Sequence, residues 1–155
     1  MRNKTLREAF VDFRSMEHRL EHVAMVRGVE YVNDSMACNI NSVWFALEKI
    51  HNKNITWIVG GQTNKSDFSD LRTLVEEKVK NIICLGLDNR PILSEFGNMG
   101  KLIIETNTAE QAVNTAYSIA QEGEVVLLSP GCPSFDLFES FQDRGNQFKS
   151  AVFEL

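Results

Sequence analysis

The chain contains few of the residues that mark non-globular proteins. Its 155 residues include only 3 prolines, 9 glycines and 3 cysteines, so the composition excludes collagen-like and low-complexity chains. No apolar run reaches the roughly 18 residues from which a membrane span is predicted. Residues 1–5 lead into no apolar stretch of the kind that a secretory signal needs. The net charge of −5 disfavours a surface that coats nucleic acid. We therefore expect a globular protein with neither a membrane nor a nucleic-acid partner.

The three cysteines are widely spaced and form no cluster. Cys38, Cys84 and Cys132 make no CxxC pair and have no histidine beside them, which argues against a disulfide framework and against a zinc site. Cys132 lacks a neighbouring base in the sequence, so a nucleophilic role is not predicted for it. This pattern predicts a cytoplasmic protein without a bound metal ion.

Five short apolar runs alternate with segments of helical periodicity. The runs are apolar along their whole length, as in parallel strands that helices cover on both faces. They span residues 30–32, 55–59, 81–85, 101–104 and 124–128. Apolar residues spaced by three and four predict helices over residues 40–50, 71–79 and 112–120, and a last helix from Ser134 to about Lys149.

Cap and turn residues mark the ends of several of these elements. Asn39 is placed to cap the helix that follows it, and Thr108 with Gln111 forms a capping box. Gly123 stands where the chain needs a left-handed residue after a helix. These signals agree with the helices that the apolar spacing predicts.

The start of the chain has a different pattern. A short helix is expected over residues 5–13, followed by a hairpin of residues 18–26 and 29–32 that turns at Gly28. The sheet should therefore be mostly parallel with one antiparallel edge strand. With the alternation of strands and helices, this predicts a single α/β domain over residues 1–155, with a Rossmann-like three-layer fold.

In a parallel sheet, ligands bind beyond the carboxyl ends of the strands. Four loops occupy this position, namely residues 33–35, 60–65, 86–89 and 129–134. Asp34 could accept hydrogen bonds from ribose hydroxyls or help to hold a metal, but taken alone it is better explained as a helix cap. Lys65, beside Gly60-Gly61, could neutralise an anion, and Ser134 could help a helix N-terminus to hold a carboxylate. Each of these two residues also has a purely structural explanation. Lys65 could be a solvated lysine in a tight turn, and Ser134 could be a second helix cap, so the sequence leaves the structural and the ligand-binding interpretations open.

The order of the motifs along the chain is more specific than any one of them. They are His18-Arg19-Leu20-Glu21, Asn33-Asp34-Ser35, Gly60-Gly61 with Asp67-Phe68, Ser129-Pro130 with Ser134-Phe135-Asp136, and Arg144-Gly145. In this order they resemble the C-terminal domain of the Mur ligases, and within that family the MurD-type ligases, which add D-glutamate to UDP-N-acetylmuramoyl-L-alanine in peptidoglycan synthesis. The resemblance begins at about residue 17 and makes residues 1–16 a leading segment at the domain boundary.

The resemblance implies that the intact protein is a cytoplasmic, ATP-dependent ligase of bacterial cell-wall synthesis, with ATP and Mg²⁺ as cofactors. The partners of this chain would be the N-terminal and central domains of the ligase, which bind the UDP substrate and the ATP phosphates. Carried over position by position, the resemblance assigns Arg19 and Asp34 to the nucleotide. It assigns D-glutamate to a second set of residues, namely Ser134, Phe135, Phe141, Cys38, Asn64 and Lys65.

Three positions depart from the pattern of the family. Met36 and Cys38 stand where the family has lysine and threonine, and Asn64 stands where it has lysine, with Lys65 next to it. Losing one charge-assisted contact costs about 1.5–3 kcal/mol. The alternative is therefore a non-catalytic, stand-alone paralogue that binds a small anion or a cell-wall enzyme. The chain also contains no GxxxxGK phosphate loop, so we expect the isolated chain to bind no cofactor and to have no ligase activity.

Overall fold

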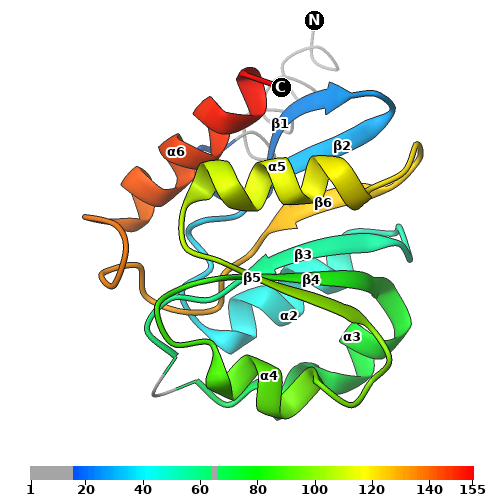
Figure 1. The fold of residues 1–155 in the computed structure, drawn as a ribbon, viewed down its shortest axis with the longest axis vertical. Helices are drawn as coiled ribbons and strands as arrows, with labels where there is room; N and C mark the ends of the chain where they lie inside the picture. Colours follow the sequence, from blue (N-terminus) through cyan, green and yellow to red (C-terminus); the bar gives the residue numbers. More distant parts are fainter. Residues whose placement is uncertain (1–15, 64–65) are drawn as a thin grey trace, which may run out of the picture.

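A six-stranded sheet forms the middle layer of the domain, in the order β1-β2-β6-β3-β4-β5 (Figure 1). The structure is a computed structural model that describes residues 16–63 and 66–155. The strands are β1 (Glu21–Val26), β2 (Val29–Asn33), β3 (Ile55–Val59), β4 (Val79–Leu85), β5 (Leu102–Thr106) and β6 (Val125–Leu128). β1 pairs with β2 in an antiparallel arrangement, and the other neighbouring strands are parallel. The predicted mostly parallel sheet with one antiparallel edge strand is confirmed.

Helices cover both faces of the sheet, as the three-layer prediction requires. One layer contains α2 (Ile40–Lys49), the 3₁₀ turn η2 (Phe68–Leu71), α3 (Arg72–Lys78) and α4 (Arg90–Phe96), and the other contains α5 (Ala109–Ile119) and α6 (Phe141–Phe153) (Figure 1). Strand β3 is apolar throughout because helices pack against both of its faces. Trp57 belongs to the core under α2 to α4, and Ile58 belongs to the core under α5 and α6. Within residues 16–63 and 66–155, no helix is both long and apolar enough to cross a membrane.

The predicted helix caps Asn39 and Thr108 are confirmed. The Asn39 side chain accepts a hydrogen bond from the Ser42 N–H at the start of α2. Thr108 accepts from the Gln111 N–H at 3.0 Å, and the Gln111 side chain accepts in turn from the Asn107 N–H at 3.0 Å. Gly123 has the expected left-handed φ of 88°, but it lies in the turn before β6 rather than at the helix end, because α5 is capped at Ala120.

The last helix begins later than predicted. The expected start at Ser134 is wrong, because α6 begins at Phe141 and residues 134–140 form a loop. Ser140 caps the helix by accepting a hydrogen bond from the Asp143 N–H at 3.0 Å, and Asp143 accepts from the Glu139 N–H at 3.1 Å. This reciprocal pair satisfies the free amides of the first turn at Ser140 rather than at Ser134.

Two further elements differ from the prediction. The sequence did not predict α4, which has 7 residues and buries only Ile92 and Phe96, too few for a helical spacing to repeat. The first strand begins at Glu21 rather than at His18, because His18 and Leu20 have φ values of 66° and 44° and cannot continue a strand. The helix expected over residues 5–13 lies outside the described residues.

Candidate functional site

The predicted loops meet at one edge of the sheet, beyond the carboxyl ends of the parallel strands. The Ser129 hydroxyl donates to Asp34 Oδ2 at 2.7 Å. The Gly60 N–H donates to the Pro130 carbonyl at 3.0 Å. The loops after β2, β3 and β6 are therefore joined, and the Thr63 hydroxyl adds the loop after β4 by donating to the Asp88 carbonyl at 2.8 Å.

Glycine at positions 60 and 61 is required by the close approach of these loops. The φ values of Gly60 and Gly61 are 136° and 139°, which L-residues with a side chain rarely adopt. A Cβ atom on Gly61 would overlap the Pro133 carbonyl oxygen, and one on Gly60 would lie 2.8 Å from the Leu85 carbonyl oxygen. A tight turn is thus enough to explain why this loop has glycine at both positions, without a bound ligand. Asn64 and Lys65 lie outside the described residues, so their assignment to D-glutamate stays a prediction.

A groove of approximately 390 Å³ lies between the end of β2 and the start of α2. It is lined by Arg19, Leu20, Asp34, Met36, Ala37, Asn41, Ser42 and Phe45. Its volume is within the range of small-ligand sites, about 300–1,000 Å³, and it combines apolar walls with a few polar groups, as such sites do. The structure brings together Arg19 and Asp34, the two residues predicted for the nucleotide, and it places Met36 beside them.

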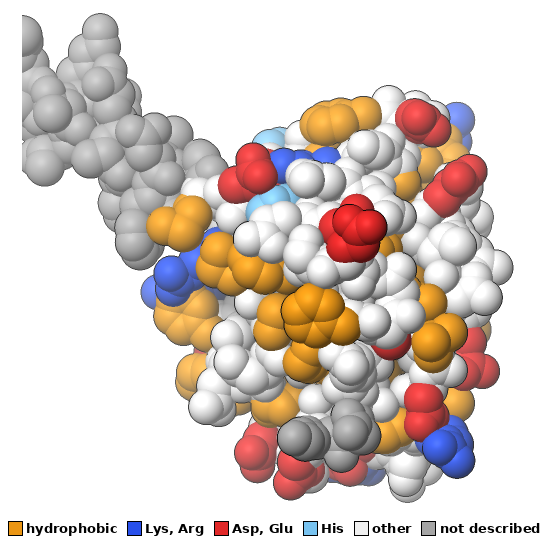
Figure 2. All heavy atoms as spheres, turned by 90° about the vertical axis from the view of Figure 1, so that its left-hand side faces the viewer, with side chains coloured by type: hydrophobic (Ala, Val, Ile, Leu, Met, Phe, Trp, Pro, Cys, Tyr) orange, Lys and Arg blue, Asp and Glu red, His pale blue; other side chains and the backbone are white. Residues whose placement is uncertain are grey.

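Apolar side chains are exposed around this edge of the sheet. Figure 2 shows the side of the molecule at which the parallel strands end, and hydrophobic side chains gather over the middle of this face. The loops at this edge contribute Met36, Leu87 and Phe135, which are 36%, 69% and 68% exposed. The predicted substrate residue Phe135 therefore projects into solvent in the isolated chain.

Asp34 has a structural partner for each carboxylate oxygen. It is 4% exposed, and while Oδ2 accepts from Ser129, Oδ1 accepts from the Leu20 N–H at 3.0 Å. Burial raises the pKa of this carboxyl group to about 6, although the hydrogen bonds and the charge of Arg19 act in the opposite direction. The helix-cap interpretation of Asp34 is wrong, because Asn39 caps α2. Asp34 instead ties the turn before β1 to the end of β6.

The residues predicted for D-glutamate are only partly brought together. Ser134 is 2% exposed, and its carbonyl accepts from the Phe138 N–H at 2.9 Å within a turn, so it caps no helix. The Phe141 carbonyl accepts from the Ser35 hydroxyl at 2.7 Å. Cys38 lies on the other side of Ser35, with its Sγ atom 3.9 Å from the Ser35 carbonyl oxygen. Phe141 and Cys38 thus share a neighbour in Ser35.

Arg144 joins these loops, and the sequence did not single it out as a functional residue. Its side chain is 1% exposed. Its guanidinium donates to the Ser35 hydroxyl and carbonyl at 2.9 and 2.8 Å and to the Cys132 carbonyl at 3.0 Å. Burial lowers the pKa of Arg144, an effect that Cys38, Cys132 and Asp136 oppose in part. A signal was present in the sequence, since position 144 lies on the same face of the helix as the apolar residues Phe141 and Phe148.

Comparison with known proteins identifies the family. Residues 18–132 match the model of the Mur ligase, glutamate ligase domain. The chain belongs to this family. It is 48% identical over 152 residues to the UDP-N-acetylmuramoylalanine–D-glutamate ligase of Christiangramia forsetii, and the match covers 98% of this chain and 34% of the relative. The enzyme of the same name from Porphyromonas gingivalis is 43% identical, covering 100% of this chain and 34% of the relative. The chain thus spans about a third of the length of these curated relatives.

Solved structures share the fold of the Mur ligase C-terminal domain. MurC from Thermotoga maritima superposes with a TM-score of 0.61 at 12% identity, over 95% of this chain and 32% of that one. E. coli FolC in complex with ADP gives a TM-score of 0.62 at 16% identity, over 90% and 32%. The Yersinia pestis folylpolyglutamate synthase/dihydrofolate synthase with AMPPNP and Mn gives 0.63 at 15% identity, over 91% and 32%. These similarities establish the Rossmann-like α/β fold.

Proposed function

We propose that this chain is the C-terminal domain of a cytoplasmic, ATP-dependent ligase that adds D-glutamate to UDP-N-acetylmuramoyl-L-alanine. The observation that supports this best is the 48% identity, along nearly the whole chain, to a ligase with that name. The groove that contains Arg19 and Asp34 at the carboxyl end of β2 agrees with a nucleotide-binding role. In the intact protein, the N-terminal and central domains would complete the active site.

The domain would contribute to the reaction by positioning and by electrostatics rather than by forming covalent bonds. Arg19 would neutralise part of the charge of ATP, and the loop of residues 134–141 would orient D-glutamate. ATP, when bound, supplies the phosphoryl group that activates the substrate carboxylate. Within the described residues, no group of three or more His, Cys, Asp or Glu side chains is close enough to hold a metal ion. We assign Mg²⁺ to the N-terminal and central domains of the intact ligase.

The isolated chain should therefore have no ligase activity. Its sequence contains no GxxxxGK phosphate loop, and phosphoryl transfer depends on groups that hold the phosphates in line with the attacking oxygen. A weak nucleotide or anion interaction of the groove is the most that we expect of it alone.

A chimera tests the proposal directly. The C-terminal third of the Christiangramia forsetii ligase would be replaced by this chain, and phosphate release would be measured with both substrates present. We expect release that depends on D-glutamate and on UDP-N-acetylmuramoyl-L-alanine. A folded chimera with no activity, whether or not Met36→Lys, Cys38→Thr and Asn64→Lys are added, would contradict the proposal.

Met36 supports the second candidate, a non-catalytic paralogue that binds a small anion or a cell-wall enzyme. It lines the groove, at a position where the family pattern has a lysine, and a thioether cannot donate a hydrogen bond to an anion. The same chimera distinguishes the two candidates. A chimera that is inactive as it stands and becomes active with the three substitutions would favour the paralogue. The scaffold would then be competent, and only the side chains that bind the substrates would have been replaced.

A further inference from the structure

The turn of residues 18–20 has an unusual backbone. His18 and Leu20 have φ values of 66° and 44°, in the left-handed region that residues other than glycine rarely adopt. The turn directs the Leu20 N–H at Asp34 Oδ1, 3.0 Å away, and places Arg19 at the groove. Such a conformation persists only where the surrounding structure holds it. The contacts of His18 therefore bear on the shape of the groove.

The His18 ring is held first by Asn33. The ring is buried, with 2% of the residue exposed, and Asn33 Nδ2 donates to its Nδ1 atom at 2.9 Å. The Asn33 amide cannot rotate freely, because its Oδ1 atom accepts from the Ser35 N–H at 3.1 Å and its Nδ2 atom also donates to Glu21 Oε1 at 3.0 Å. Nδ1 of His18 thus accepts from the Asn33 amide, and Nε2 lies 2.9 Å from Glu17 Oε1.

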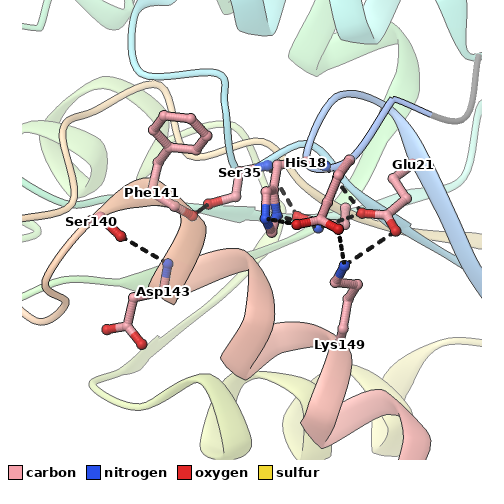
Figure 3. A network of polar contacts seen from close by, with 9 residues as sticks. His18, Glu21, Ser35, Ser140, Phe141, Asp143 and Lys149 are labelled. Carbon is pink, nitrogen blue, oxygen red and sulfur yellow. Dashed lines mark hydrogen bonds and ion pairs between the residues drawn. The ribbon is translucent and has the colours of Figure 1, made fainter. Parts of the chain in front are cut away.

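Helix α6 also packs against the His18 ring. A Cβ atom on Gly145 would overlap His18 Nδ1, so the ring fits only because position 145 is glycine. The Phe141 ring meets the His18 ring edge-on, with centroids 6.0 Å apart. One turn after Gly145, Lys149 Nζ lies 3.3 Å from Glu21 Oε2 and 3.6 Å from Glu17 Oε2. Figure 3 shows Lys149, Glu21 and His18 together, with Phe141 and Ser35 on the other side of the ring.

We infer that His18 is a positioning residue for the groove: seated on Gly145 of α6, it holds the 18–20 turn so that Arg19 faces the groove and the Leu20 N–H binds Asp34. His18 is not among the residues that line the groove, so it acts through its two neighbours in the chain. The consequence for nucleotide binding rests on the proposed function. The geometric part of the inference does not, since it concerns only contacts within the chain.

The experiment uses the whole chain with Gly145→Ala, His18→Ala and the double variant. Alanine normally stabilises a helix interior relative to glycine, so a harmful effect of Gly145→Ala would come from the His18 ring, which a Cβ atom would overlap, or from Asn33 Nδ2, 3.1 Å from that Cβ atom. Asn146→Ala is the matched control, because Asn146 is the next residue of α6 and is exposed. Amide hydrogen exchange is measured at Leu20 and at Ile58, a fully buried residue of β3, and the affinity for ADP is measured by calorimetry.

Gly145→Ala and His18→Ala should each accelerate exchange at Leu20 by roughly tenfold, the effect of losing one hydrogen bond, and leave Ile58 unchanged. Each should weaken ADP binding by a similar factor. The double variant should be little worse than His18→Ala, because without the ring the added methyl group meets only Asn33 Nδ2, 3.1 Å away. Asn146→Ala should resemble the wild type in all three measurements.

Three results would overturn the inference. Exchange at Leu20 that stays at the wild-type rate would show that the ring does not hold the turn. Equal acceleration at Leu20 and Ile58 would show general destabilisation only. Additive effects in the double variant would show that Gly145 acts on something other than the ring. If the wild-type chain alone binds too little ADP to measure, exchange at Leu20 still decides whether His18 positions the turn, and the chimera described above tests the nucleotide role separately.

A second pair of variants makes the test independent of how well Gly145→Ala folds. His18→Asn keeps an acceptor near the position of Nδ1, within reach of the Asn33 amide, whereas His18→Leu keeps only the bulk. His18→Asn should therefore retain more protection at Leu20 than His18→Leu. Equal loss of protection in the two variants would contradict a role that depends on the hydrogen bond.

Discussion

The Asp34 carboxylate at the end of β2 and the Ser129 hydroxyl at the end of β6 are joined by a 2.7 Å hydrogen bond in the interior of the domain. The bond links the two strands whose loops carry most of the predicted site. The Asp34 carboxyl group is itself buried. Its hydrogen-bond donors among the described residues, Ser129 and the Leu20 N–H, are both neutral. Such a group is stabilised less by the fold when it is charged than when it is protonated.

Asp34 should therefore make stability depend on pH. Burial raises its pKa from 3.8 to about 6, so the folded state binds this proton more tightly than the unfolded state does. Its contribution to the free energy of unfolding is fully present below pH 4 and is lost as the pH rises through about 6. The difference is on the order of 2–3 kcal/mol.

The variant Asp34→Asn isolates this effect. An asparagine can accept from the Leu20 N–H and donate to the Ser129 hydroxyl, so both hydrogen bonds can be kept. We expect the variant to be at least as stable as the wild type at pH 7, and the difference between the two to vanish below pH 4. Chemical denaturation at a series of pH values measures it. A difference that is constant from pH 4 to pH 7 would show that Asp34 titrates normally.

Arg144 should be necessary for the stability of the domain. Arg144→Met removes the donors that satisfy two buried carbonyl groups, those of Ser35 and Cys132. Leaving buried acceptors unpaired costs about 1–3 kcal/mol each, so we expect a total loss of roughly 2–4 kcal/mol in the free energy of unfolding. Arg90→Met is the control, because the Arg90 side chain is 87% exposed and pairs with Asp88 in the loop just before α4. Equal stability of the two variants would contradict this account.

The sheet could be predicted from the sequence because its signals are local. A strand such as β3, which supplies Trp57 to one core and Ile58 to the other, has to be apolar at successive positions, and this is visible in the sequence. The caps Asn39 and Thr108 were recognised for the same reason, since a cap and the amide that it binds lie within three residues. Both features depend on neighbours in the chain.

The parts that the sequence did not predict depend on contacts between distant residues. The fit of the His18 ring against Gly145 and the bonds of Arg144 to Ser35 join the two ends of the chain. Seen alone, a glycine in the last helix indicates a break, and an arginine indicates an exposed charge. Only the packing of α6 against the start of the sheet shows why a small residue and a buried donor occupy these positions.

The start of α6 gives a prediction about helix capping. Ser140→Ala removes the acceptor of the Asp143 N–H and should lower the free energy of unfolding by about 1 kcal/mol. Ser150→Ala, at an exposed position within the same helix, should have little effect or stabilise slightly, because alanine is the better helix former. Thermal unfolding of the two variants makes the comparison. A larger loss for Ser150→Ala would indicate that the helix does not begin at Phe141.

The last prediction concerns a cation at position 36 of the groove. Met36 lines the groove beside Arg19 and Asp34, and it is 36% exposed, so a longer, charged side chain at this position can reach a bound anion. A charge-assisted hydrogen bond contributes about 1.5–3 kcal/mol, which corresponds to a gain of roughly tenfold or more in affinity. We therefore expect Met36→Lys to bind ADP at least about tenfold more tightly than the wild type.

Met25→Lys is the matched control for this substitution. Met25 is 61% exposed and pairs with Glu30 at the opposite end of β2 from Asp34. Met25→Lys therefore changes the net charge by the same amount as Met36→Lys but places the new lysine far from the groove. Calorimetric titration at two salt concentrations compares the variants, since a general charge effect would be equal in both and would decline with salt. Adding Cys38→Thr and Asn64→Lys extends the test to D-glutamate, which we expect the wild type to bind weakly or not detectably. If the wild-type chain binds ADP and D-glutamate well and the variants bind no better, another group already neutralises the anion, and the departures at these positions do not weaken the site.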